Sequence, residues 1–222
     1  MKVVIAGLAA AAALFLVSWV ASPTLDDFVR SRSVEVTTTA CGVASRTNGT
    51  AVLFGESHVL TAAHLVIGAG SVSVRIDGTE LDADVIGLDR RTDLALLDVA
   101  GVRSRPLELG NPRAGDAVIF APHGGESQWA EITRTLEIRI EEERSTTRSS
   151  RFGFELDTSV SLGDSGSGVY NDNGELLGLI FGRSTTRENR SFAVRSSEIE
   201  ELLAAPARQF VCNPAESQIL PI

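Results

Sequence analysis

The feature of this sequence that most limits its fold is a series of short apolar and β-branched segments, each bounded by turn-forming residues. Dipeptides such as Asp77-Gly78 and Asn173-Gly174 are typical of tight hairpin turns. Regular short spacing with few helical periods predicts an all-β barrel or sandwich. The predicted strands are 50–54, 59–62, 71–76, 94–99, 116–120, 132–140, 152–156, 168–170, 176–181 and 192–195.

One segment has helical periodicity instead. In "SSEIEELLAA", residues 196–205, Ile199, Leu202 and Leu203 recur at the spacing of one apolar helix face. Ser197 and Glu200 have the spacing of a capping box, which marks a helix N-terminus. We expect a short helix there and an irregular tail over 206–222.

The charge of the chain argues against a nucleic-acid partner. Its 222 residues carry a formal net charge of −9, whereas phosphate binding requires clustered Lys and Arg. The only Arg-dense stretch, "RSTTRSSR" at 144–151, follows three glutamates and contains no aromatic residue. We interpret it as a solvated loop.

The N-terminal segment predicts export. Lys2 is followed by an uncharged run from Val3 to Ala21. That run is longer than the ~7–15 apolar residues of a usual signal peptide and close to the ~20 that span a bilayer. Residues 1–22 are therefore a cleaved signal peptide or an uncleaved membrane anchor, and either places the body outside the cytoplasm. Residues 23–40 are expected to be a linker.

The two cysteines, Cys41 and Cys212, lie near the two ends of the expected folded domain, 41–205. In an exported chain they predict one disulfide, worth up to about 5 kcal/mol in the loop-entropy model; two separate buried thiols are the alternative. No metal-binding spacing is present, so we expect neither a metal ion nor a cofactor.

Three polar residues are candidates for nucleophilic catalysis. His64 ends "HVLTAAH", Asp93 lies in "RTDLALLDV" and Ser165 lies in "GDSGSG". A serine hydroxyl needs a neutral imidazole to take its proton, and a carboxylate must hold that imidazole in the correct tautomer. The carbonyl under attack becomes an oxyanion, which the backbone N–H groups of Gly163 and Ser165 could bind.

Other residues compete for these roles. Asp89 and Asp98 flank Asp93, but Asp89 precedes a turn and Asp98 ends the apolar run. His58 and His123 are expected to be surface or loop residues.

The segments "LTAAH", "RTDLALL" and "GDSGSG" resemble, in this order, the three catalytic segments of the chymotrypsin-like (trypsin-like) serine proteases. "RTDLALLDV" and "SFAVRSSEI" look most like the bacterial periplasmic branch of that fold. The resemblance implies two six-stranded antiparallel β-barrels, the second starting near Asp116, with the substrate cleft between them. It implies a protease domain over 41–205.

The sequence departs from the family pattern in two respects. Ser167 and Gly168 stand where the family usually has Gly and often Pro. No sequence is present that resembles the family's activation cleavage site, so insertion of a newly cut N-terminus beside Asp164 is not expected.

The resemblance also implies a specificity pocket. Its base would be Ser159, six residues before the nucleophile, and its wall would be the strand that contains Ile180 and Gly182. Ser159 is not acidic, so we expect a small or apolar preference, although Arg183 at the cleft edge could attract acidic side chains.

We therefore expect a secreted, periplasmic or membrane-anchored serine endopeptidase that cleaves protein or peptide substrates through an acyl-enzyme. The alternative is a trypsin-like fold that serves as a binding or scaffold module with weak or no catalysis. An esterase is disfavoured because a hairpin, rather than a helix, follows Ser165.

Overall fold

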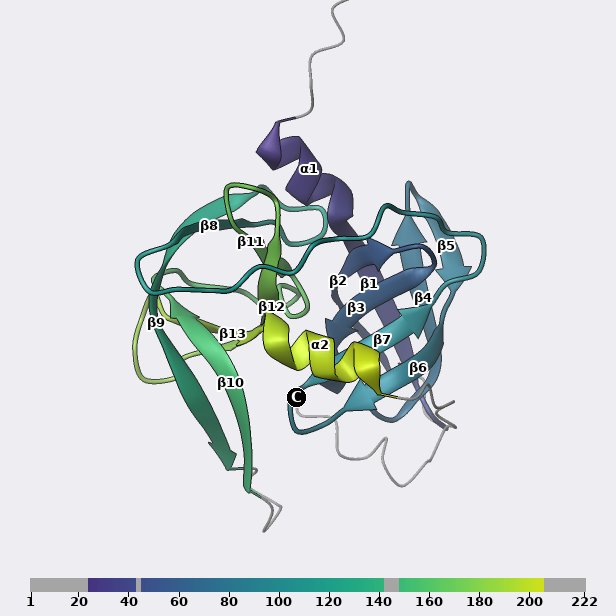
Figure 1. Cartoon of the computed structure of the whole chain (residues 1–222). Coiled ribbons are helices and arrows are strands. Elements are labelled where there is room, and N and C mark those ends of the chain that lie inside the picture. The colour runs from purple at the N-terminus through teal and green to yellow at the C-terminus, as the bar shows by residue number, and fades with distance from the viewer. Residues whose placement is uncertain (1–23, 43–44, 142–147, 206–222) are drawn as a thin grey trace, which may run out of the picture.

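Two sets of antiparallel strands account for most of the residues that the structure describes, which are 24–42, 45–141 and 148–205. In this computed structural model the two sets lie side by side, and one helix lies near their junction at the front while the other lies above it (Figure 1). The predicted all-β architecture is confirmed.

The first set is a seven-stranded sheet in the order β5-β4-β1-β2-β3-β7-β6. The resemblance predicted six strands here, of which the sequence pattern located four, 50–54, 59–62, 71–76 and 94–99. One of the strands that it did not locate lies in the range assigned to a linker; Val34 and Val36 are buried in it, and it pairs with both β2 and β4. The strands are β1 Ser33–Ala40, β2 Arg46–Gly55, β3 His58–Ala62, β4 Ala69–Ile76, β5 Thr79–Asp82, β6 Asp84–Asp89 and β7 Leu94–Asp98.

The second set closes into a six-stranded barrel in the order β10-β13-β12-β11-β8-β9, as expected. The pairing of β9 with β10 extends into a long hairpin that projects from the barrel (Figure 1). The strands are β8 Ala117–Phe120, β9 Gln128–Glu141, β10 Arg148–Leu156, β11 Gly168–Tyr170, β12 Leu176–Arg183 and β13 Ser191–Arg195.

Helix α1, Leu25–Arg32, joins the two sets rather than forming part of a linker. Thr24 and Asp27 cap its N-terminus reciprocally. The ring of Phe28 meets Tyr170 of the second barrel edge to face, with 6.0 Å between centroids. On the other side, Arg32 Nη1 donates to the Leu53 carbonyl of the first sheet at 3.3 Å.

Helix α2, Ser196–Ala204, leaves β13 directly and packs against both sets. Ile199 and Leu202 are buried, as its periodicity predicted. The predicted capping box is wrong: the N-cap is Arg195, with no side-chain cap. Because the strand runs straight into the helix, the first-turn side chains bond elsewhere; Ser196 Oγ donates to the Gly110 carbonyl at 2.6 Å.

The junction between the two sets is itself a hydrophobic core. Leu60 and Leu94 of the first sheet lie in one buried cluster with Ile119 and Leu179 of the second barrel. Each set also has a separate apolar cluster of its own. Burial of apolar surface therefore holds the two halves together as well as each half.

Several expectations concern residues outside the described ranges. These are the N-terminal segment 1–22, the tail 206–222 and Cys212. Cys41 is buried and is not a free thiol, but its pairing with Cys212 stays a prediction. None of the helices described has the length and apolar character to cross a membrane.

The packing of β12 gives a direct test of this architecture. A Cβ at Gly178 would lie 2.0 Å from the Val194 carbonyl oxygen of β13, whereas a Cβ at Gly182 in the same strand would meet nothing within 4 Å. Gly178→Ala should lower the free energy of unfolding by about 3 kcal/mol or more, because backbone must move. Gly182→Ala should change it by about 0.5 kcal/mol at most. Urea unfolding measures both, and equal effects would contradict the pairing of β12 with β13.

Candidate active site

His64 and Asp93 are brought together by strand pairing. β3 and β7 run antiparallel with Ala62 opposite Leu94, so the residues just after β3 lie beside the residue just before β7. His64 sits in a single turn of 3-10 helix, Ala63–Leu65, that follows β3. The Ala63 N–H donates to the Asp93 carbonyl at 3.0 Å, which fixes the two backbones against each other.

The Asp93 carboxylate contacts His64 twice. Oδ2 lies 2.8 Å from His64 Nδ1, and Oδ1 accepts from the His64 backbone N–H at 2.8 Å. This arrangement leaves Nε2 of the ring as the nitrogen that can accept a proton. Asp93 has a left-handed backbone, with φ of 62°, and is nearly buried. Asp is one of the few residue types other than Gly that adopt this left-handed conformation without a large penalty.

The competing residues bond elsewhere. Asp89 accepts from the backbone N–H of Arg91, and Asp98 accepts from the Ser57 hydroxyl at the far end of β7. His58 is paired opposite Asp98 at that same end. The backbone N–H of His123 donates to the Thr50 hydroxyl.

Ser165 follows a tight turn over residues 161–164. The Asp164 N–H donates to the Ser161 carbonyl at 3.2 Å, and Gly163 has a φ of 101°. A positive φ at the third residue is the signature of a type II turn, which requires glycine there. Within the described residues, the backbone N–H groups of Gly163 and Ser165 donate no hydrogen bond. Both are therefore available to an external acceptor.

Asp164 stabilises this turn from inside. Its Oδ2 accepts from the Ser161 backbone N–H at 2.7 Å. Burial raises the pKa of the Asp164 carboxyl above its usual value, and the Ser161 hydrogen bond offsets part of that rise.

Thr50 of β2 holds the Ser165 turn from the opposite sheet. Its N–H donates to the Ser165 carbonyl at 2.9 Å and its hydroxyl donates to the Gly163 carbonyl at 2.8 Å. A Cβ at Gly166 would lie 2.0 Å from the Thr50 carbonyl oxygen. Glycine at 166 thus permits the backbone of one half to pass directly against that of the other.

The structure therefore places all three predicted residues at the junction of the two halves. It joins His64 to Asp93 directly. In the described part of the chain, no hydrogen bond joins the Ser165 hydroxyl to the His64 ring.

The predicted specificity residues have different positions. The side chain of Ile180 lies in the core of the second barrel and is fully buried, so it cannot line a pocket, and this expectation is corrected. The backbone of Ile180 instead bonds Gly166 and Ser167. Ser167 is fully buried.

The other three predicted specificity residues are Ser159, Gly182 and Arg183. Ser159 is exposed and its hydroxyl donates to Asn189 at 3.0 Å. Gly182 borders open space. Arg183 is exposed, and its Nη1 donates to the Val160 carbonyl at 3.4 Å, reaching from β12 to the segment before the turn.

Sequence reasoning missed two side chains at the site. Thr50 gave no signal beyond its place in a strand. Arg151 was assigned to a solvated loop, but it lies in β10, is 5% exposed and has Nη1 3.4 Å from Asp93 Oδ2. The signal that could have placed it in a strand is the alternation of the following residues, Phe152, Phe154 and Leu156.

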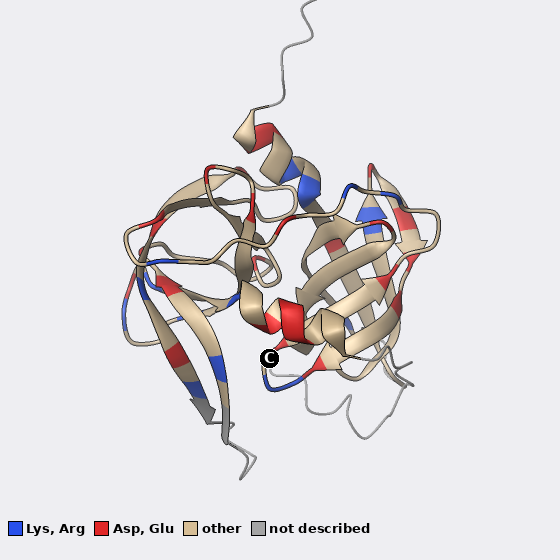
Figure 2. Ribbon diagram, viewed as in Figure 1, with Lys and Arg blue, Asp and Glu red and all other residues tan. Residues whose placement is uncertain are grey.

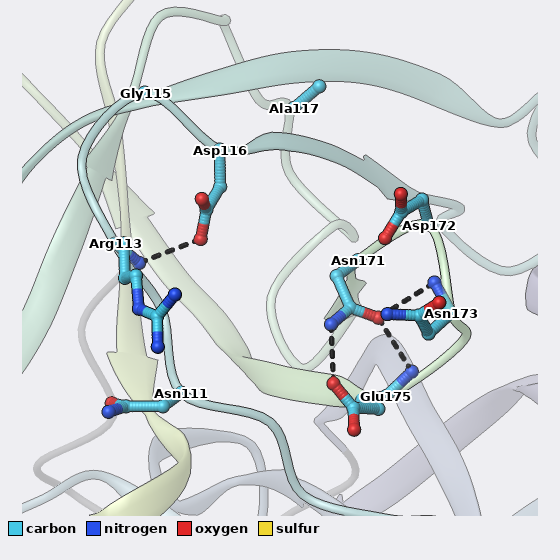
Figure 3. Close-up of a pocket in the computed structure, with 9 residues that line it drawn as sticks. All are labelled: Asn111, Arg113, Gly115, Asp116, Ala117, Asn171, Asp172, Asn173 and Glu175. Atoms are coloured by element: carbon cyan, nitrogen blue, oxygen red, sulfur yellow. Dashed lines mark hydrogen bonds between the residues drawn. The ribbon is translucent and has the colours of Figure 1, made fainter.

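A polar pocket of about 460 Å³ lies elsewhere, where the loop before β8 meets the β11–β12 turn. Figure 3 shows Asn171 bonded to Asn173 and Glu175 on one side and Arg113 bonded to Asp116 on the other. None of the predicted catalytic or specificity residues lines it.

Residues 49–179 match the model of a trypsin-like peptidase domain. The chain is 32% identical over 153 residues to a probable periplasmic serine endoprotease DegP-like of Pseudomonas putida, a match that covers 64% of this chain and 31% of that protein. It is 28% identical over 166 residues to serine protease Rv3671c of Mycobacterium tuberculosis, covering 70% of this chain and 41% of that protein. The chain thus spans less than half the length of these curated relatives.

Solved structures agree with the fold. The active form of the Rv3671c protease from M. tuberculosis superposes with a TM-score of 0.75 at 22% identity, covering 86% of this chain and 89% of that one. The HtrA-type protease AlgW with a tripeptide gives 0.67 at 24% identity, covering 81% and 61%.

The contacts of Thr50 generate a prediction. Thr50→Val keeps the side-chain shape but leaves the Gly163 carbonyl and the His123 N–H without this partner. The free energy of unfolding should fall by about 1–3 kcal/mol, and Ser165 should react more slowly with a serine-directed reagent. The control is Thr38→Val, a buried threonine of β1 that does not contact the turn. If both variants react at the wild-type rate, Thr50 does not organise the turn.

Proposed function

The chain belongs to the trypsin-like peptidase domain family, and on that premise we propose that it is a serine endopeptidase that uses Ser165, His64 and Asp93. The observation that carries the proposal is the 2.8 Å contact between His64 Nδ1 and Asp93 Oδ2. It holds the imidazole in the tautomer whose Nε2 is free to accept the proton of a serine hydroxyl.

In the proposed mechanism, Ser165 Oγ attacks the carbonyl carbon of a peptide bond while its proton passes to His64 Nε2. The resulting imidazolium is stabilised by Asp93 and then gives its proton to the leaving amine, so that the peptide bond breaks and an acyl-enzyme remains. Water, deprotonated by His64, attacks the ester, and the proton returns to Ser165 as the acid product leaves.

The proposed oxyanion hole consists of the N–H groups of Gly163 and Ser165. Support comes from the positive φ of Gly163 and from the absence of an acceptor for either N–H in the described residues. Donors that are already oriented stabilise the developing charge without reorganisation during the reaction.

We propose that protein or peptide substrates lie at the junction of the two halves. Arg183, exposed beside the segment that leads to Ser165, would favour an acidic side chain over a basic one there. Because the Ile180 side chain is in the core, Ser159 as the base and Gly182 as part of the wall are the remaining predicted residues of the specificity pocket.

We also propose that the domain acts outside the cytoplasm. Two observations support this location: the uncharged apolar run over 3–21 and the similarity to a protein named as a periplasmic endoprotease. The proposed domain would extend from Thr24, because α1 and β1 pack with it, to Ala205.

Covalent labelling tests the nucleophile. A fluorophosphonate probe should label the wild-type protein with a stoichiometry near one, and Ser165→Ala should abolish labelling. Ser161→Ala changes an exposed serine in the same turn and should label as the wild type does. Correctly folded wild-type protein that takes no label would defeat the peptidase proposal and favour a binding or scaffold module.

A substitution that preserves shape tests Asp93. Asp93→Asn should reduce kcat on a peptide library by roughly 10⁴-fold, because the amide favours the wrong imidazole tautomer. Asp98→Asn, at the other end of β7, provides the matched control and should retain kcat within about threefold. Near-normal turnover of Asp93→Asn would remove Asp93 from the mechanism.

A further inference from the structure

We propose that Arg151 is a positioning residue that holds the Asp93 carboxylate in place from the second barrel and so sets the orientation of the His64 ring. The proposal rests on the proposed function, since positioning matters only if His64 acts on Ser165. No feature of the sequence near the three catalytic segments points to Arg151, which lies in a different strand of the opposite half.

The contact between Arg151 and Asp93 is an ion pair. Arg151 Nη1 lies 3.4 Å from Asp93 Oδ2, the same oxygen that lies 2.8 Å from His64 Nδ1. The guanidinium also lies over the ring of Phe181 in β12, with 4.7 Å between its central carbon and the ring centroid. This cation–π contact is a second interaction that holds the guanidinium, so Oδ2 lies between a cation and the imidazole.

Burial of the Arg151 guanidinium costs free energy, which indicates a role other than stabilising the fold. Arg151 is 5% exposed, and neither Nε nor Nη1 has a hydrogen-bond partner among the described residues. Burial lowers the pKa of Arg151 from its usual value, while the negative charges of Asp93, Asp89 and Glu198 oppose that fall. A buried ion pair is often no better for stability than apolar packing, so its presence beside a catalytic carboxylate calls for a functional reason.

The backbone on either side of Arg151 is anchored to the half that carries Asp93. The Ser150 carbonyl accepts from Arg91 Nη1 at 3.3 Å. The Phe152 N–H donates to Glu198 Oε1 of α2 at 2.8 Å, and the other oxygen of Glu198 pairs with Arg91 at 2.8 Å. Figure 2 shows the acidic helix α2 above the basic turn between β6 and β7 that supplies Arg91. This network fixes the base of the Arg151 side chain relative to Asp93.

The role follows from these contacts. Asp93 is oriented by its own half through Oδ1, which accepts from the His64 N–H. Through Oδ2 it is also oriented by the second barrel, which carries Ser165. Arg151 therefore positions the Asp93 carboxylate, which orients His64, relative to the half that carries Ser165. Without Arg151, Oδ2 loses its cation and the side chain gains freedom to rotate away from Nδ1.

The experiment compares Arg151→Met, Arg151→Gln and Arg151→Lys with Arg134→Met in the full chain. Arg134 also pairs with a buried carboxylate of the second barrel, Glu155, at 2.7 Å, but it does not touch the site. Two readouts are used: kcat and KM on a cleavable peptide, with active sites titrated by fluorophosphonate, and the low-field proton resonance of the His64 Nδ1–H hydrogen bond. That resonance reports the His64–Asp93 contact without requiring turnover.

We expect Arg151→Met and Arg151→Gln to lower kcat roughly 10- to 100-fold, the range seen when a group that orients a metal-bound histidine is lost. KM should change by less than about twofold, because a group 5% exposed does not reach a substrate. The resonance should shift or broaden in both variants. Arg151→Lys should recover part of kcat and of the resonance, and Arg134→Met should alter neither.

A wild-type kcat with an unmoved resonance in Arg151→Met and Arg151→Gln would overturn the proposal. An equal loss of kcat in the Met, Gln and Lys variants, again with an unmoved resonance, would also overturn it, because the side chain would then act only by filling space. If Arg151→Met does not fold, the Gln and Lys variants decide. A wild-type protein inert to the probe defeats the peptidase proposal alone, since the resonance still tests the contact of Arg151 with Asp93.

Discussion

The structure depends on one close backbone contact, where β2 of the first sheet meets the turn that carries Ser165. Thr50 donates from its N–H and its hydroxyl to two carbonyls of that turn, and Gly166 passes so near the Thr50 carbonyl that no side chain fits. Apolar burial at the junction is non-directional and could not alone fix the relative position of the two halves. The directional hydrogen bonds of Thr50 fix the relative position of the two halves. The position of Ser165 relative to His64 depends on it.

Much of the site could be predicted because its signals are local. Glycines around Ser165 indicate a turn with positive φ, and the three short motifs that contain His64, Asp93 and Ser165 resemble the catalytic segments of a known family. The pairing of β3 with β7, which joins His64 to Asp93, was not predicted from the residues. The predictions of local structure failed where contacts with distant parts of the chain determine the structure. Ser197 and Glu200 match a capping box locally, but β13 enters the helix directly. The alternation of Val34 and Val36 was a usable strand signal within the range assigned to a linker.

Arg151 illustrates a different limit. A run of arginines near glutamates ordinarily lies in water, and local composition contains no information about a carboxylate 58 residues earlier in the chain. Burial of a charge becomes tolerable only once the fold supplies a partner. Such residues are found from three-dimensional contacts, and in this chain the contact is with Asp93.

The turn at 161–164 has a consequence for how such a peptidase would be controlled. Asp164 closes the turn by accepting from Ser161, within four residues of the chain. One carboxylate oxygen of Asp164 is thus engaged within the turn itself, and an ammonium group that bound the same oxygen would have to displace the Ser161 N–H. In the function proposed here, any control that acts through Asp164 would first have to open this turn.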